Sequence, residues 1–320
     1  MPDRLNARAC RLVEEGGHDP AALRIENRRT VAGGVVVDCG LYAEGGLRAG
    51  LWLAEVCLAG LASVSVTHRL FGNRQWPHVE VWTDFPVEAC LLSQYAGWQI
   101  SLSDYFAMAS GPMRAAVAQE ELFDRLGYRE RASRVVGVLE TSQLPDDAVV
   151  RYVAEAAGVA PDRVTLLSAP TSSPAGNLQV VARSVETALH KLFELEFDVQ
   201  RVRSACGIAP LPPVAQDDLT GIGRTNDAIL YGGCVTLWVT GDDASLRKIG
   251  PKVPSESSSS FGRPFLEIFD AAGRDFYQID PHLFSPAVIV FQNIETGRVH
   301  CFGQTRPDVL TTSFGLPEPP

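Results

Sequence analysis

The stretch from residue 164 to residue 197 limits the possible folds more than any other part of the sequence. It begins with a short apolar run, Val164 to Leu167, which contains β-branched residues and predicts a strand. Pro170, Pro174 and Gly176 then predict a turn, and a long run of helix-forming residues follows. A strand that leads through a tight turn into a helix is a building unit of α/β proteins.

The predicted helix carries an apolar stripe and a charged pair. Val181, Ala188 and Leu192 recur at spacings of seven and four residues, so they can share one buried face. Arg183 and Glu186 lie three residues apart and therefore project from neighbouring points of the helix. Such a pair is most often an exposed ion pair that contributes little to stability. The rarer interpretation is a catalytic base beside a guanidinium, and the spacing alone leaves both open.

A metal site is not expected. Glu186 and His190 lie four residues apart, as do ligands on one side of a helical zinc site. The HExxH pattern of such sites is absent, and the six histidines of the chain show no ligand spacing.

Composition and charge exclude some classes of function. At 320 residues, the chain is long enough for two modest lobes or one large domain. Apolar residues make up 46% and charged residues 21%, which is typical of soluble globular proteins. The net charge of −10 argues against a nucleic-acid partner, which favours a basic surface. An anionic ligand would need arginines concentrated at its site.

The cysteines and the apolar segments predict a cytoplasmic protein. The seven cysteines are dispersed and form no CxxC pair, a pattern typical of reduced thiols: Cys10, Cys39, Cys57, Cys90, Cys206, Cys234 and Cys301. The first 17 residues contain no apolar signal core. The most apolar helix-like run, Leu47 to Val66, contains Arg48 and Glu55, so we interpret it as a packed helix and expect no membrane span.

Strands and helices alternate along the rest of the chain, which predicts a mixed α/β fold. Helices are expected at 3–17, 87–94, 115–126 and from 146 to 157, and strands at 31–39, 64–69, 79–83, 98–102, 134–139, 235–240, 288–293 and 299–303. Residues 221–233 are expected to form a polar loop flanked by glycines. They lack the third glycine of a dinucleotide loop and the ending of a P-loop. Residues 255–260 are expected to form a mobile polar loop.

Two parts of the chain repeat one order of elements. A strand, a proline turn, a helix, a strand and a Gly/Pro loop occur between residues 79 and 112, and again between 164 and 210. The repeat indicates a weak internal duplication, with a chance likeness of common elements as the alternative. We therefore predict two related lobes, residues 1–130 and 131–320, with a substrate cleft between them and segments that the lobes may exchange.

Several separated segments resemble one family, the methenyltetrahydromethanopterin cyclohydrolases. The segments occur in the expected order at residues 89–100, 108–115, 180–195, 221–233 and 275–287. The likeness covers nearly the whole chain, from about Asn6 to Thr311, and five motifs in register are specific. Tyr95 departs from the more usual form, which has a lysine there.

The resemblance implies an activity, an assembly and a setting. The activity is the reversible hydrolysis of the methenyl bridge of 5,10-methenyltetrahydromethanopterin to the 5-formyl form. The setting is one-carbon metabolism, either in methanogenesis or in the formaldehyde oxidation of methylotrophy. The family likeness also implies two α/β lobes around a pterin, no cofactor, no nucleic-acid or membrane partner, and a homo-oligomer that is a trimer.

The resemblance assigns catalysis to Glu186 and Arg183. Glu186 would take a proton from the attacking water and later deliver one to the departing nitrogen. Arg183 would orient Glu186 or the water and hold the developing carbonyl oxygen. A neighbouring guanidinium weakens a carboxylate as a base, whereas burial strengthens it, and the sequence does not show which effect is larger.

Five further residues are candidate substrate contacts. Ser110, Gly111 and Arg114 are expected to bind the polar tail of the ligand, with a turn that only ends a strand as the alternative. Asn226 and Asp227 are expected to hydrogen-bond the edge of the pterin ring, with helix capping as the alternative.

Three other functions compete with this one. The first is hydrolysis of a C–N bond in another pterin or folate, and the second is pterin binding without catalysis. The intact pair of Arg183 and Glu186 argues against a pure binding protein. The third, a Rossmann oxidoreductase, is disfavoured because the glycine fingerprint is missing.

Overall fold

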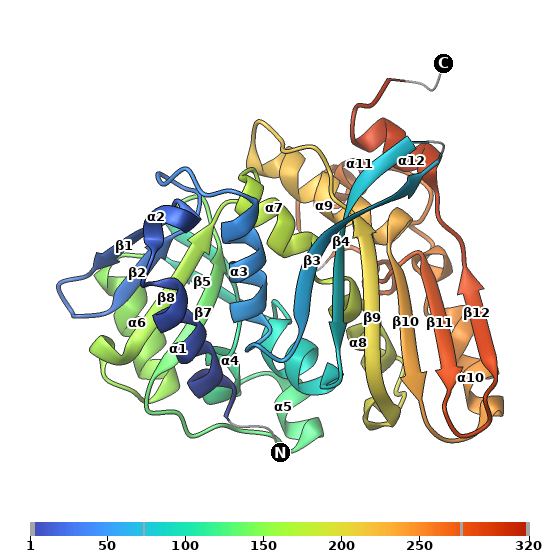
Figure 1. Ribbon diagram of the computed structural model, residues 1–320, viewed down its shortest axis with the longest axis horizontal. Helices are drawn as coiled ribbons and strands as arrows, with labels where there is room; N and C mark the ends of the chain where they lie inside the picture. The colour runs from blue at the N-terminus through green and yellow to red at the C-terminus, as the bar shows by residue number, and fades with distance from the viewer. Residues whose placement is uncertain (1–3, 73, 276–277, 318–320) are drawn as a thin grey trace. The chain divides into compact units, whose positions relative to one another are not determined.

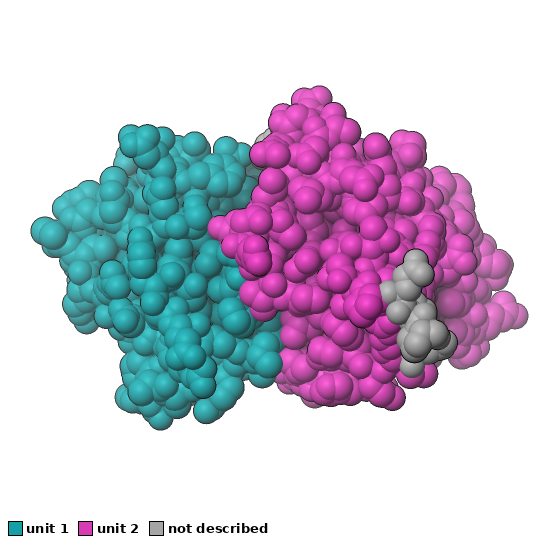
Figure 2. Space-filling model, turned by 90° about the horizontal axis from the view of Figure 1, so that it is seen from above, with its two compact units in different colours: residues 1–62, 88–179 teal, residues 63–87, 180–320 magenta. Residues whose placement is uncertain are grey.

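The computed structural model describes residues 4–72, 74–275 and 278–317. The chain forms two compact units, each built from two separate segments (Figure 2). The first unit contains residues 1–62 and 88–179, and the second contains residues 63–87 and 180–320. Each unit has one six-stranded sheet with helices, so the predicted mixed α/β class is confirmed.

The first unit is built on a sheet with the strand order β1-β2-β8-β7-β6-β5 (Figure 1). Its strands are β1 (Glu26–Arg29), β2 (Val35–Asp38), β5 (Trp98–Leu102), β6 (Tyr105–Ser110), β7 (Val135–Glu140) and β8 (Val164–Ala169). The neighbours β2, β8 and β7 run parallel, and the remaining pairs are antiparallel. The carboxyl ends of the three parallel strands therefore lie at one edge of the sheet.

Helices cover both faces of this sheet. They are α1 (Leu5–Gly16), α2 (Pro20–Leu23), α3 (Leu47–Cys57), the π-helix η1 (Val87–Gln94), α4 (Met113–Val117), α5 (Glu121–Leu126), α6 (Asp147–Ala157) and the 3₁₀ turn η2 (Pro161–Arg163). On one face, α1 and α3 pack around Leu53 against Val136 and Leu167. On the other face, α6 packs through Val149 and Val153. Alternate strand residues are thus buried in two separate apolar layers.

The second unit has the strand order β12-β11-β10-β9-β4-β3. Its strands are β3 (Ser63–Phe71), β4 (Arg74–Thr83), β9 (Val202–Pro210), β10 (Cys234–Val239), β11 (Val288–Asn293) and β12 (Val299–Gly303). Only β10 and β11 are parallel. Helix α7 (Pro174–Val181) spans the boundary between the units.

The helices of the second unit lie mainly on one side of its sheet. They are α8 (Ser184–Glu194), α9 (Asp218–Gly232), α10 (Asp243–Ile249), α11 (Phe265–Ala271) and α12 (Pro307–Ser313), with 3₁₀ turns η3 (Val199–Arg201), η4 (Gly250–Lys252), η5 (Ser255–Ser257) and η7 (Pro281–Leu283). Figure 1 shows α8 and α10 behind strands β9 to β12, and α9, α11 and α12 beyond their upper ends. Helix α8 packs on β4, β9 and β10. No helix in the described ranges has the length and apolar character needed to cross a bilayer.

The boundary predicted at residue 130 differs from this division. Strands β7 and β8 follow residue 130 in the chain, yet they form the middle of the first sheet. Residues 63–87 supply β3 and β4 to the second sheet. Strand pairing across distant parts of the sequence, which no local pattern reveals, therefore decides the composition of each unit.

The predicted duplication is wrong. In the first copy, the antiparallel hairpin of β5 and β6 stands between the helix and the loop that follows Ser110. In the second copy, Gly207 to Pro210 lie inside β9 and form no loop. The two copies share a local order of elements but not a topology.

Two predicted helices are interrupted. The helix expected at 47–66 ends at Cys57, because Ala59 and Gly60 both have positive φ values, and β3 begins at Ser63. The helix expected at 115–126 is divided into α4 and α5 at Ala118, whose φ is 47°. A residue in the left-handed region cannot continue an α-helix.

Two predicted loops are also wrong. Residues 221–233 belong almost entirely to α9, which starts where the side chain of Asp217 accepts a hydrogen bond from the amide of Thr220 at 2.8 Å. The segment 255–260 is held in place, because Ser255 is fully buried and its hydroxyl donates to the carbonyl of Leu230 at 2.5 Å. Ser258 donates to Asp280 Oδ2 at 2.6 Å.

Several local predictions are confirmed. Strands β5, β11 and β12 have the predicted bounds, and β2 lies within the predicted range 31–39. Helix α6 starts as its acidic sequence indicates, since Asp146 Oδ1 accepts a hydrogen bond from the amide of Val149 at 3.1 Å. Strand β1 has no counterpart among the predictions, because its four residues are exposed and polar.

Candidate functional site

The predicted catalytic pair lies at the start of α8. The sequence predicts a single helix after the proline turn, but the structure has two, α7 and α8. The helix is interrupted by a turn at Ala182 and Arg183, and the chain itself is continuous. Arg183 occupies the N-cap position of α8, and Glu186 lies in its first turn. Arg183 and Glu186 are only 5% and 4% exposed. The interpretation as an exposed surface pair is therefore wrong.

The start of α8 lies unusually close to the sheet. A Cβ atom on Gly207 of β9 would come within 2.5 Å of Ser184 Oγ and 2.8 Å of Val185 Cγ2. Any side chain at position 207 would therefore push the first turn of α8 off the sheet, and Glu186 with it. The sequence pattern predicts a loop at Gly207, whereas this residue lies inside β9. A glycine inside a strand pattern was the available signal, because it often marks a close backbone approach.

The preceding turn is fixed by local contacts. Ser173 Oγ accepts a hydrogen bond from the amide of Gly176 at 3.0 Å and donates to the carbonyl of Pro170 at 2.8 Å. A Cβ atom on Gly176 would lie 2.0 Å from that carbonyl oxygen, so only glycine fits there. Pro174 occupies the first position of α7, where its missing amide proton costs nothing. This geometry explains why Gly176 lies inside a helix and not in the predicted turn.

The far end of α8 is anchored by a buried lysine. Lys191 Nζ donates to the carbonyl of His282 at 2.7 Å and to Ser257 Oγ at 3.3 Å. Burial lowers the pKa of Lys191 to about 8. These contacts hold the turns η5 and η7 against the helix. Glu186 therefore projects from a helix that is fixed near both of its ends, which favours a defined side-chain position.

Ser110, Gly111 and Arg114 lie in the first unit, where β6 turns into α4. Strand β6 ends at Ser110, whose hydroxyl donates to the carbonyl of Val138 at 3.2 Å. Gly111 has φ +87°, a value that favours glycine. Arg114 Nη1 donates to the carbonyls of Leu91 and Ser93, both at 3.2 Å. These contacts are those of a turn that ends a strand.

The guanidinium of Arg114 is enclosed by its own unit. Its Nε donates to Glu120 Oε1 at 2.8 Å, and its Nη2 pairs with Glu120 Oε2. The guanidinium carbon lies 5.1 Å from the ring centroid of Tyr95 and 5.3 Å from that of Phe123. Arg114 is 1% exposed, and its contact with the ring of Tyr95 would be lost with a lysine at position 95.

Asn226 and Asp227 lie on α9 in the second unit. Asn226 Nδ2 donates to the carbonyl of Ile222, one turn earlier, at 2.8 Å. Asp227 is fully buried, and its Oδ1 accepts a hydrogen bond from the amide of Phe265 at 2.8 Å. Its Oδ2 accepts from Ser313 Oγ at 2.5 Å. Because Phe265 is the first residue of α11, Asp227 caps that helix from a neighbouring one, which agrees with the capping alternative.

The candidate residues fall into two sets, one in each unit. Arg183, Glu186, Asn226 and Asp227 belong to the second unit, on two different helices, and the three residues near the start of α4 belong to the first. In the predicted segment 275–287, Phe276 and Tyr277 lie outside the described residues. Asp280 in that segment accepts a hydrogen bond from the amide of His282 at 3.0 Å.

Other possible sites carry none of the predicted residues. Within the described ranges, no group of three or more His, Cys, Asp or Glu side chains is placed to hold a metal ion. The first unit has a cavity of about 600 Å³ lined by Ala116, residues 129–132, Ala157 and Gly158.

Comparison with known proteins points to one family. A family model described as "Cyclohydrolase (MCH)" matches residues 4–314. A methenyltetrahydromethanopterin cyclohydrolase of Rhodopirellula baltica is 50% identical over 292 residues, which cover 90% of this chain and 88% of that protein. Proteins of the same name from Methylobacillus flagellatus and Methanocella arvoryzae are 43% and 42% identical, over 95% and 98% of this chain and 93% and 98% of their own lengths.

Proposed function

Because the chain belongs to the methenyltetrahydromethanopterin cyclohydrolase family, we propose that it reversibly hydrolyses 5,10-methenyltetrahydromethanopterin to 5-formyltetrahydromethanopterin. The family match spans almost the whole chain, and the relatives that carry this name match over most of their own length. The observation that carries the proposal is the burial of Arg183 and Glu186 together at the start of α8.

The proposed chemistry needs a base and a proton donor. The methenyl carbon lies between two nitrogens in a delocalised cation, so it is already electrophilic. Water attacks this carbon while Glu186 accepts one of its protons. The bond from the carbon to N10 then breaks as the proton returns from Glu186 to that nitrogen. The second proton of the former water leaves the new hydroxyl for solvent, so the carbon becomes a neutral formyl group and one proton is released overall. The carboxylate also attracts the cationic substrate, which a guanidinium alone would repel.

Arg183 is proposed to position this reaction. It lies three residues before Glu186, so its guanidinium can orient the carboxylate or the attacking water. It can also donate a hydrogen bond to the oxygen that becomes the formyl carbonyl. The close contact of α8 with Gly207 and the anchoring of Lys191 support the proposal, because a positioned base is more effective than a mobile one.

Among the other predicted contacts, Asn226 is proposed to bind the pterin ring. Its Oδ1 has no donor among the described residues and can accept a hydrogen bond from the ring edge. Ser110, Gly111 and Arg114 are proposed to bind the polar tail of the ligand, and Asp227 the edge of the pterin ring. The alternative is a structural role, which their contacts with other protein groups support.

The cellular location, partners and assembly of the protein are proposed from its composition and from the family resemblance. The dispersed cysteines support a cytoplasmic location, and the acidic charge supports a small-molecule substrate without nucleic acid. The resemblance supports a homotrimer in one-carbon metabolism, including formaldehyde oxidation in methylotrophy.

A purified-protein assay tests the activity. Loss of the methenyl chromophore is followed with the methenyl forms of tetrahydromethanopterin and of tetrahydrofolate. We expect turnover with the first carrier and much slower turnover with the second. Tight binding of both carriers without turnover would contradict the proposal and would favour a binding protein.

Substitution of Glu186 tests the mechanism. Glu186→Gln removes the base but keeps the size of the side chain, so we expect turnover to fall about 10²–10⁴-fold while substrate binding persists. The matched control is Glu194→Gln, which changes the exposed last residue of the same helix and should leave turnover unchanged. A Glu186→Gln enzyme with the wild-type rate would show that another group is the base.

A further inference from the structure

The first unit has a cavity that contains none of the residues assigned to catalysis. Its volume is about 600 Å³, and its wall is formed by α4, by the end of α6 and by the connector between α5 and β7. All of these segments belong to the first unit, whereas Arg183 and Glu186 belong to the second. A cavity of this size lies within the range of small-molecule sites, which is about 300–1,000 Å³.

Small apolar side chains leave the space open. Ala116 on α4, Ala132 on the connector and Ala157 at the end of α6 line the cavity. Each of them belongs to the core of the first unit or packs against it, so the wall is already formed before a ligand binds. Among the described residues, no aromatic side chain lines the cavity, so a flat ring would gain no stacking there. The wall therefore fits a short aliphatic body.

Two arginines on the connector supply positive charge. Arg129 and Arg131 both line the cavity, and both are exposed to solvent. Arg129 Nη2 donates to the carbonyl of Val117 at the long distance of 3.4 Å. The guanidinium of Arg131 forms no hydrogen bond or ion pair with any residue that the structure describes. Both arginines can therefore contact a ligand.

Positive charge is concentrated here although the chain as a whole is acidic. The net charge is −10, yet residues 125–134 contain four arginines: Arg125, Arg129, Arg131 and Arg134. Arg134 pairs with Glu14. A further guanidinium lies beside the connector, because Arg4 Nη1 donates to the carbonyl of Arg131 at 2.8 Å. Such a local concentration of arginines lets an acidic protein attract an anion.

The acidic residue of the cavity wall already has partners. Glu130 is 5% exposed, and its Oε2 accepts hydrogen bonds from Asn6 Nδ2 at 3.1 Å and from the amide of Asn6 at 3.2 Å. Asn6 lies in the first turn of α1, where the free amide groups carry partial positive charge. The charge of Glu130 is therefore balanced by α1, and the positive charge of the two arginines remains in excess.

The geometry of these groups indicates which ligand fits. Each guanidinium can form two parallel hydrogen bonds to a carboxylate or a phosphate. Arg129 and Arg131 are two residues apart, so their Cα atoms lie within about 7 Å and one small ligand can contact both side chains. The carbonyl groups at the end of α6, near Gly158, carry partial negative charge. The charged groups of a ligand should therefore lie on the arginine side of the cavity.

From these observations we propose that the cavity binds a small aliphatic dianion, a dicarboxylate or a phosphate ester, which both guanidinium groups contact. A dianion neutralises the two arginines together, whereas a monoanion leaves one of them without a counter-charge. The proposal goes beyond the hydrolytic function, because it does not depend on the chemistry of Glu186.

Titration calorimetry at low ionic strength tests the proposal. Wild-type protein is titrated with succinate, with inorganic phosphate and, as the monoanion control, with acetate. We expect one succinate or phosphate ion per chain and at least about tenfold weaker binding of acetate. Tighter binding of succinate would assign the site to dicarboxylates, and tighter binding of phosphate would assign it to phosphate esters. Equal binding of acetate, or no heat with either dianion at millimolar concentrations, would overturn the proposal.

Arginine variants test the location of the site. Arg131→Ala should weaken binding of the dianion at least about tenfold, and Arg131→Lys should weaken it less, because lysine keeps the charge but loses the paired donors. The side chain is exposed, so both variants should fold. The matched control is Arg29→Ala, which removes the same charge from an exposed arginine of β1 in the same unit. An equal loss in Arg29→Ala and Arg131→Ala would show that only the net charge matters, and would overturn the proposal.

Steady-state kinetics separate this site from the site of hydrolysis. At constant ionic strength, we expect succinate and phosphate to leave the KM for the methenyl substrate unchanged. A rise in KM that Arg131→Ala abolishes would make the cavity part of the substrate site and would overturn the proposal of a separate ligand. A wild-type protein that binds the dianion but shows no turnover would overturn the proposed hydrolysis and leave the dianion site standing.

Discussion

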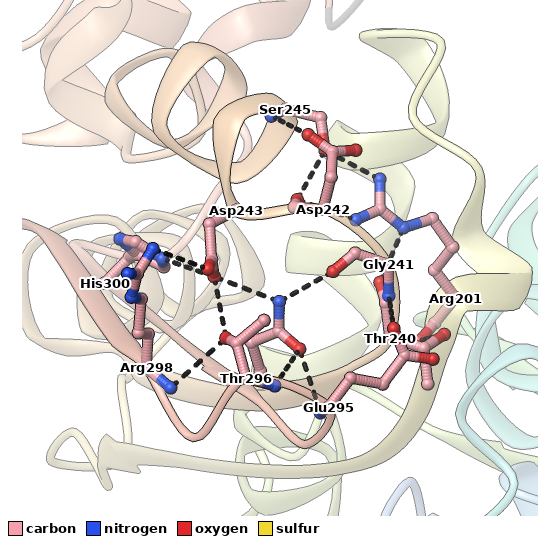
Figure 3. A network of polar contacts seen from close by, with 11 residues as sticks. Arg201, Thr240, Gly241, Asp242, Asp243, Ser245, Glu295, Thr296, Arg298 and His300 are labelled. Carbon is pink, nitrogen blue, oxygen red and sulfur yellow. Dashed lines mark hydrogen bonds and ion pairs between the residues drawn. The ribbon is translucent and has the colours of Figure 1, made fainter.

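Two carboxylates of the second unit both have little exposed surface but have opposite acidities, and Asp227 is enclosed more deeply than Asp243. Asp243, the first residue of α10, is 7% exposed, and Asp227 is fully buried. The polar atoms around Asp243 are His300 Nε2 at 3.0 Å, Asn293 Nδ2 at 3.0 Å, Thr296 Oγ1 at 3.1 Å and Arg298 Nη1 at 3.2 Å (Figure 3). The hydrogen bond to His300 is the main cause that lowers the pKa of Asp243 to about 2.

Asp227 has fewer and weaker donors. The hydroxyl of Ser313 and the amide of Phe265 contact it, and neither carries a charge. Burial therefore has the larger effect and raises the pKa of Asp227 to about 7. The comparison shows that a deeply buried carboxylate with few, uncharged donors has a raised pKa, whereas one near the surface with several donors has a lowered pKa.

This difference matters for the proposed mechanism. A general base has to accept and release a proton near the working pH. A carboxylate surrounded like Asp243 stays ionised and serves structure, whereas one surrounded like Asp227 can exchange a proton. A base at Glu186 therefore requires surroundings like those of Asp227, with few and uncharged donors.

The largest effect is expected for Asp243→Asn. The new amide nitrogen would face groups that are themselves donors, so at least one of them would lose its partner. We expect a Tm several degrees below that of Asp242→Asn, the matched control, which removes the same charge at the adjacent residue. Asp242 caps α10 by accepting a hydrogen bond from the amide of Ser245, and asparagine caps equally well. Equal Tm values for the two variants would show that the donors around Asp243 do not depend on its carboxylate.

The next largest effect is expected in the pH dependence of folding stability, to which Asp227 contributes. Its pKa in the folded state is about 7, above the value of about 3.9 expected in the unfolded chain. Between these values the folded state holds one proton more, so the contribution of Asp227 lowers stability as pH rises from about 4 to about 7. The slope is at most about 1.4 kcal/mol per pH unit, and no further loss from this group occurs above pH 7.

Urea unfolding at pH 5, 6, 7 and 8 measures this slope. We expect Asp227→Asn to remove it, so the variant should exceed the wild type in stability most clearly at pH 8. The control is Asp308→Asn, because the ion pair with Arg306 lowers the pKa of Asp308 and places its titration below this pH range. A wild-type slope that persists in Asp227→Asn would assign the titration to another group.

The smallest effect is expected for Ser313→Ala. This change removes a donor to the ionised form of Asp227, so the pKa of Asp227 should rise further. We expect a loss of about 1–2 kcal/mol at pH 8, with a smaller loss at pH 5, where Asp227 is protonated. Thr312→Ala on the same helix is the control, since Thr312 does not contact Asp227. Equal losses at the two pH values would show that the hydroxyl does not act through Asp227.

The bounds of helices and strands could be predicted from the sequence where neighbouring residues alone determine them. The bounds of β5, β11 and β12 follow from short apolar runs, and the start of α6 follows from Asp146. Helix α9 was missed because Gly221 and Gly223 are typical of a loop. Their presence in a helix has a tertiary cause, since a Cβ atom on Gly223 would lie 3.2 Å from Leu266 Cβ.

The candidate site shows the same division. The spacing of Arg183 and Glu186 was visible in the sequence, and the family likeness assigned their roles. Their burial and the need for glycine at position 207 were not visible, because both depend on a strand that follows α8 in the chain. The ion pair of Arg114 with Glu120 joins residues only six apart, yet its enclosure also requires the ring of Tyr95.

The sequence by itself determined the class of fold, the family and the positions of the charged residues, because each of these depends on residue type and order. Only the tertiary structure decided which segments form each unit, which carboxylates are surrounded by donors and which sheet face stays uncovered. These properties arise when residues far apart in the chain meet, and the free energy of such contacts depends on geometry that no local pattern contains.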